Sequence, residues 1–87
     1  MFEIITIKDV KLKLGEACKF QRKAHGLSRS ELAELLQLSS TTIQNIENGK
    51  NATLDNLLKV ANHFGLLNSI ARGIDTLTTS ENNNSLY

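Results

Sequence analysis

The feature that most constrains the fold is a pair of short helical segments within residues 28–48, separated by only three residues. Residues 28–31, Ser-Arg-Ser-Glu, form a capping box, in which the serine hydroxyl accepts a bond from a first-turn amide and the glutamate reaches back. After the break at 37–39, Ser39 caps the second segment and Asn48-Gly49 ends it. The spacing predicts two short helices joined by a tight turn.

Helical periodicity covers much of the remaining chain. One helix is predicted to begin between Lys8 and Lys11, with Thr6 or Asp9 as its cap, and to end at Gly26. Another runs from a cap at Thr53 to Gly65, and the apolar residues 66, 67, 70 and 74 form a fifth element. The faces expected to be buried are Leu32, Leu35 and Leu36 in the second helix, and Leu54, Leu57, Leu58, Ala61 and Phe64 in the fourth.

The two ends of the chain differ from this pattern. Residues 2–7 are apolar and β-branched and predict a short extended segment. Either these residues or residues 67–74 are expected to supply a strand that pairs across a dimer. From Thr76 the composition shifts to Thr, Ser, Asn and Glu, which predicts a flexible polar tail over 76–87 after a domain over 1–75. The expected fold class is therefore all-α, with four or five helices in one domain.

Charge and cysteine content exclude several protein classes. The net charge is only +1, so any basic surface must be local. Basic residues crowd the first third of the chain: Lys8, Lys11, Lys13, Lys19, Arg22, Lys23 and Arg29. The single cysteine, Cys18, has no partner for an internal disulfide and is expected to be a small core residue. No signal peptide and no apolar run of membrane-spanning length is visible, so the expectation is a cytoplasmic protein without a membrane partner.

The outer face of the third predicted helix is unusual in composition. It carries small polar side chains at Ser40, Thr41, Gln44, Asn45 and Asn48, and only Ile43 and Ile46 are apolar. Such side chains suit the edges of base pairs, because Asn and Gln can hold adenine with two hydrogen bonds and Thr can touch the thymine methyl. From polarity alone, a plain solvated face explains the pattern equally well.

Residues 14–33 and 39–50 resemble the Xre/lambda-repressor family, and the resemblance extends over residues 14–66. It implies a double-stranded DNA partner with a palindromic operator, and no cofactor. It also implies base contacts from Ser40, Thr41, Gln44 and Asn45, and phosphate contacts from Arg29, Asn48, Lys50 and Thr53. Arg22 and Glu47 match the family's buried ion pair. Arg29 stands where the family usually has Gln, which puts that glutamine's hydrogen bond to the recognition helix in question.

Residues 48–66 are similar to a narrower group, the HipB-type antitoxins. That resemblance implies a homodimer that represses its own operon and holds a HipA-type kinase toxin inactive. The chain length, the apolar segment 66–74 and the polar tail ending in Tyr87 fit this group. Two alternatives stay open: a phage-like or metabolic repressor with no toxin partner, and a protein-interaction module that no longer binds DNA.

No pattern in the sequence indicates an enzyme. The histidines, His25 and His63, lie far apart and lack cysteine partners at metal-binding spacing. There is no glycine-rich phosphate loop and no arrangement of nucleophile and base. Neither catalysis nor a metal site is expected.

Overall fold

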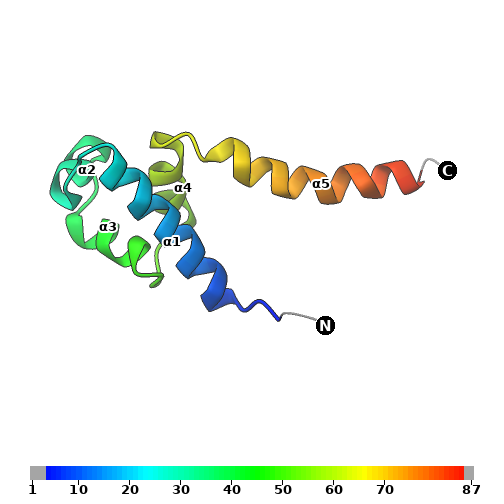
Figure 1. Cartoon of the computed structure of the whole chain (residues 1–87), viewed down its shortest axis with the longest axis horizontal. Coiled ribbons are helices and arrows are strands. Elements are labelled where there is room, and N and C mark those ends of the chain that lie inside the picture. The colour runs from blue at the N-terminus through cyan, green and yellow to red at the C-terminus, as the bar shows by residue number, and fades with distance from the viewer. Residues whose placement is uncertain (1–3, 86–87) are drawn as a thin grey trace.

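The computed structural model describes residues 4–85, with side chains as far as residue 78. Five helices follow one another: α1 (Ile7–Ala24), α2 (Arg29–Leu36), α3 (Ser40–Glu47), α4 (Leu54–His63) and α5 (Leu67–Ser85). The first four gather into one body, and α5 runs away from it (Figure 1). No strand occurs within residues 4–85, so the predicted all-α class is confirmed.

Local capping explains where the helices begin and end. The predicted Ser28 box is present, with Glu31 N donating to the Ser28 hydroxyl at 3.0 Å and Ser28 N donating to the Glu31 carboxylate at 2.8 Å. Thr6 and Asp9 form an equivalent box at the start of α1. At the other ends, Gly26, Gly49 and Gly65 follow the caps of α1, α3 and α4 with φ near +70°, a conformation that costs glycine little.

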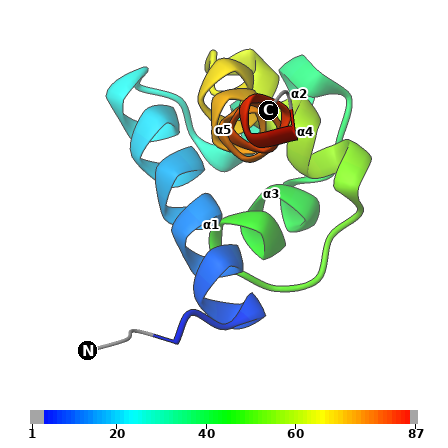
Figure 2. The same cartoon turned by 90° about the vertical axis from the view of Figure 1, so that its right-hand side faces the viewer.

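The hydrophobic core lies where α1 to α4 meet. Its buried members are Cys18, Leu32, Ala33, Ile43, Ile46, Val60 and Ala61. Figure 2, which looks along α5, shows α1 on one side and α4 on the other, with α3 between them. Burial, and secondarily the charge of Glu47, raises the pKa of the Cys18 thiol to about 11. The thiol is therefore protonated at neutral pH.

A glycine sets the distance between α1 and α3. Gly15 is buried on α1, and a Cβ there would collide with the carbonyl oxygen of Ile46 and lie 2.7 Å from that of Glu47. Only a residue without a side chain permits this contact. The backbone approach fixes the position of α3 against the rest of the body.

Two expectations about buried faces were wrong. Leu35 is 59% exposed, because the buried face of α2 consists of Leu32, Ala33 and the partly buried Leu36. Leu54 is 69% exposed at the first position of α4, where Val60 takes a place in the core instead. Periodicity located each helix but not the exact direction of its apolar face.

The ends of the chain also differ from expectation. Helix α1 begins at Ile7, earlier than predicted, because Thr6 rather than Asp9 is the cap. Residues 67–74 are helical, so the strand predicted there is wrong, whereas residues 4–6 lie before α1 and a strand from them across a dimer stays a prediction. The reason is that apolar side chains at 67, 70 and 74 repeat with helical rather than strand spacing.

Helix α5 continues through the region predicted as a tail. It extends without interruption across residue 75 to Ser85. The Thr76 and Thr78 hydroxyls donate to the carbonyl oxygens of Arg72 and Asp75, at 2.8 and 3.1 Å, within the helix. No proline interrupts this stretch. The flexibility of residues 76–87 stays a prediction, and Phe2, Glu3 and Tyr87 lie outside the described residues.

Candidate nucleic-acid interface

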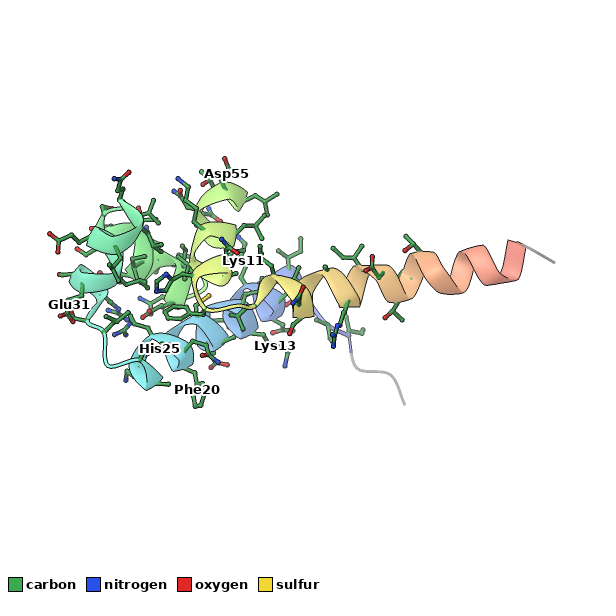
Figure 3. The ribbon with its side chains drawn as sticks, turned by 90° about the horizontal axis from the view of Figure 1, so that it is seen from above. Lys11, Lys13, Phe20, His25, Glu31 and Asp55 are labelled. Carbon is green, nitrogen blue, oxygen red and sulfur yellow. The ribbon has the colours of Figure 1, made fainter. Side chains whose placement is uncertain are left out.

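Helices α2 and α3 and the turn between them form a compact unit. Gln37 ends α2 in the left-handed conformation, at φ 58°, and Leu38 N donates to Ala33 O at 2.8 Å. The chain then enters α3 through Ser39, whose hydroxyl accepts from Thr42 N at 3.0 Å. Glu31 lies in the first turn of α2, where its carboxylate completes the capping box (Figure 3). These local bonds fix the turn of three residues that the sequence predicts.

One face of α3 is buried and the other is free. Ile43 and Ile46 are 1% and 3% exposed and hold the helix against the core. On the opposite side, Ser40, Thr41 and Gln44 are exposed, and Asn45 is partly buried. Within residues 4–78, these four side chains make no hydrogen bond. Their donors and acceptors are therefore available to a ligand.

Arg22 and Glu47 form a buried ion pair that joins α1 to the end of α3. Arg22 donates through two nitrogens to the Glu47 carboxylate, at 2.5 and 3.0 Å. A third nitrogen donates to the carbonyl of Leu27 at 2.8 Å. The side chains are 8% and 1% exposed. The pair is bidentate, which is the geometry in which arginine–carboxylate hydrogen bonds are strongest.

Arg29 adds a second positive charge to the same carboxylate. Its Nε donates to Glu47 Oε1 at 2.9 Å, and its side chain is 33% exposed. A bond from the first residue of α2 to α3 thus exists in this chain, although arginine replaces the glutamine of the family pattern. Burial by itself raises the pKa of Glu47, but hydrogen bonds from Arg22 and Arg29, and their charges, outweigh it and lower the pKa.

This network changes the distribution of charge that the sequence suggested. Two of the seven basic residues of the first third, Arg22 and Arg29, are paired with Glu47. Glu47 is the only acidic residue of α3, and it is buried. The outward face of α3 therefore carries no exposed carboxylate that would repel a polyanion.

The residues that the family pattern assigns to phosphates flank α3. Arg29 is the first residue of α2, and Asn48 is the C-cap of α3. Lys50 follows in the loop, and Thr53 is the N-cap of α4, where its hydroxyl accepts from Asn56 N at 3.1 Å. Asn48, Lys50 and Thr53 are exposed. Along the chain, Arg29 thus precedes α3, and Asn48, Lys50 and Thr53 follow it.

Sequence reasoning missed one bond beside this loop. Lys11 Nζ on α1 donates to Asn51 Oδ1 at 2.6 Å. It ties the start of α1 to the loop that carries Lys50. Because the two residues are 40 positions apart, no local pattern in the sequence predicts the contact.

The histidines serve packing. His25 and His63 both lie against Phe64, with ring centroids 5.2 and 4.9 Å from it. His25 Nδ1 also lies 2.8 Å from the carbonyl oxygen of Gln21. Within the described residues, no three His, Cys, Asp or Glu side chains gather as a metal site would require. The described helices include none that combines the length and apolarity needed to span a bilayer.

Comparison with known proteins identifies the family. A family model described as "Helix-turn-helix" matches residues 19–69, more than half of the chain, and includes α2, α3 and α4. A comparison with curated proteins finds no match. The matched segment contains the capped turn, the free polar face of α3 and the Arg22–Glu47 pair. The chain belongs to the Xre/lambda-repressor-like helix-turn-helix family of DNA-binding transcription regulators.

Proposed function

We propose that the protein is a homodimeric repressor that reads an inverted-repeat operator with α3. The observation that carries this proposal is the free polar face of α3. Ser40, Thr41, Gln44 and Asn45 have unused hydrogen-bonding groups, while the only carboxylate of the helix is buried against two arginines. The exposed face of α3 therefore offers a polyanion hydrogen-bonding groups and no carboxylate.

The chemistry of each side chain suggests its role in the major groove. Gln44 and Asn45 can each hold an adenine through two hydrogen bonds, Thr41 can contact a thymine methyl, and Ser40 can donate or accept. Arg29, Asn48, Lys50 and Thr53 hold phosphates on either side. These phosphate contacts position the helix and make the affinity fall with salt. Two copies on one face of the duplex place their recognition helices about 34 Å apart, one helical turn.

Substitution at Asn45 tests the reading of bases. The assay is a gel shift with the DNA upstream of the protein's own gene and an excess of random competitor. We expect Asn45→Ala to lose about 1–3 kcal/mol of preference for the operator while it keeps its affinity for random DNA. Asn62→Ala, at an exposed asparagine of α4, is the matched control. Equal losses on operator and random DNA would refute base reading by Asn45.

Lys50→Ala tests the assignment to phosphate in the same assay. Because a phosphate contact carries no sequence information, binding should weaken alike on all sequences, and the slope of log K against log salt should fall by about 1. No shift by the wild-type chain at low salt would instead favour a protein-interaction module without DNA binding.

We further propose that the repressor is the antitoxin of a HipA-type kinase toxin encoded beside it. The support is the resemblance of residues 48–66 to HipB-type antitoxins. Co-expression with the neighbouring gene product tests this. A stable complex with a kinase, and relief of its toxicity, is the expected result. A neighbouring gene that encodes no kinase would leave a repressor with no toxin partner.

A further inference from the structure

A small cavity lies between the first half of α1, the end of α3 and α4. In Figure 2, the loop that follows α3 passes the start of α1 before it enters α4, and this loop supplies one wall. The cavity has a volume of about 80 Å³ and is lined by Lys11, Leu14, Ile46, Lys50, Ala52 and Leu57. It is separate from the free polar face of α3, because none of the four base-reading candidates lines it.

The inner wall of this cavity is apolar. Ile46 is 3% exposed, and Leu14 and Leu57 are partly buried. An apolar cavity of about 150 Å³ accepts a benzene ring, so roughly half of that volume suits a chain of about three or four carbon atoms. Such a chain would cover the three side chains, and binding is favoured in proportion to the apolar area that is removed from water.

Two lysines give the cavity wall a positive charge. Lys11 Nζ donates to Asn51 Oδ1 at 2.6 Å, which holds the ammonium group beside the loop and leaves two of its three donors for a ligand. Lys50 is exposed, and within the described residues it forms no salt bridge. No acidic residue lines the cavity. Charge complementarity therefore favours an anion that also carries an apolar chain.

We infer that the cavity binds a short-chain aliphatic monocarboxylate. Its chain lies against Leu14, Ile46 and Leu57, and its carboxylate pairs with Lys11 and Lys50. Hydrogen bonds between an ammonium group and a carboxylate are charge-assisted, which makes them stronger than bonds between neutral groups. An inorganic anion could pair with the lysines but would leave the apolar wall uncovered, so it fits the cavity less well.

Occupation of the cavity should oppose DNA binding, and this step rests on the proposed contact of Lys50 with a phosphate. A carboxylate that pairs with Lys50 takes the cation that the phosphate would otherwise use. The coupling is reciprocal, so the ligand weakens DNA binding by the same factor by which DNA weakens ligand binding. Because only one phosphate-binding side chain is affected, we expect a factor of roughly 5–10, at the low end of the usual range. The carboxylate would thus act as an inducer.

Methyl NMR on the full chain without DNA tests the site, with butyrate as the probe. We expect saturable shifts of the methyl resonances of Leu14, Ile46 and Leu57, with a Kd in the millimolar range because so small a ligand makes few contacts. Acetate lacks two methylene groups and should bind roughly 10-fold more weakly. Butylamine carries the opposite charge and should not bind. Equal affinities for butyrate and acetate would show nonspecific pairing with the lysines and would overturn the site.

Two variants test the wall of the cavity. Ala52→Leu adds a side chain that fills the space, so the butyrate shifts should disappear. Ala24→Leu is the matched control, because Ala24 is an exposed alanine of α1 that does not line the cavity. Lys11→Gln should weaken butyrate binding roughly 10-fold, the effect of losing one hydrogen bond to a charged group, and Lys11→Arg should largely restore it. Undiminished binding by both Ala52→Leu and Lys11→Gln would overturn the assignment.

Fluorescence anisotropy with labelled DNA from upstream of the gene tests the inducer role. Sodium butyrate replaces sodium chloride at constant ionic strength, because affinity for DNA depends on salt. At saturating butyrate, the affinity of the wild type should fall roughly 5- to 10-fold, and that of Ala52→Leu should not change. An unchanged affinity of the wild type would overturn the inducer role. A chain that binds no DNA would overturn the proposed function and the inducer role together, whereas the NMR titration decides the site separately.

Discussion

Replacing Glu47 by Gln removes one charge from the centre of the network that holds α3 in place. Gln and Glu side chains have nearly the same volume, so the substitution leaves no cavity. Arg22 would remain 8% exposed with no carboxylate to balance it, and only its bond to the Leu27 carbonyl would survive unchanged. Removing one partner from such a buried pair costs about 3–5 kcal/mol.

The two arginines should rank differently from Glu47 and from each other. Arg22→Ala removes three hydrogen bonds but leaves Glu47 paired with Arg29. Its cost should therefore approach, but not exceed, that of Glu47→Gln. Arg29→Ala leaves the Arg22–Glu47 pair intact and removes one bond from a side chain that is a third exposed. Solvent screening limits that cost to about 0.5–1 kcal/mol.

Thermal unfolding followed by circular dichroism at neutral pH measures this ranking. A loss of about 3 kcal/mol corresponds to a fall in Tm of roughly 12 °C or more in a domain of this size. The expected order of destabilisation is Glu47→Gln, then Arg22→Ala, then Arg29→Ala. If Glu47→Gln melts within a few degrees of the wild type, or if Arg29→Ala costs as much, the network does not hold α3 as argued.

Three further predictions concern the acid stability of the Glu47 network, the contact of α1 with α3, and the residue that ends α2. The pKa of Glu47 is lowered in the folded chain, so the ionised carboxylate stabilises the fold. This contribution to the free energy of unfolding is fully present above about pH 4.3, the ordinary pKa of Glu, and is lost as the pH falls through the lower pKa of the folded chain. When unfolding is measured along an acid titration, Glu47→Gln should therefore lose less stability than the wild type. Gly15→Ala should unfold the domain or force α1 away from α3, because its Cβ meets backbone oxygens, and a wild-type Tm would contradict the close approach. Gln37→Gly should raise Tm by several degrees, because Gln37 has φ 58° and a left-handed residue with a Cβ costs about 1–2 kcal/mol; an unchanged or lower Tm would show that this strain is absent.

Local hydrogen bonds are the part of the fold that the sequence determined by itself. The box at Ser28 and the caps at Ser39 and Thr53 join residues three positions apart. They form wherever the chain enters a helix, whatever packs against it. The glycines after α1, α3 and α4 act in the same local way. Helix number and the polar face of α3 were accordingly predictable.

Tertiary packing decided which residues meet across the chain. Arg29 and Glu47 are 18 positions apart and Lys11 and Asn51 are 40 apart, so their bonds exist only because the Gly15 approach and the core fix the helices relative to one another. The same packing left Leu35, Leu54, and Ile74 and Leu77 of α5 exposed. The spacing of apolar residues shows that a helix has a face, but the positions of its neighbours decide whether that face is buried.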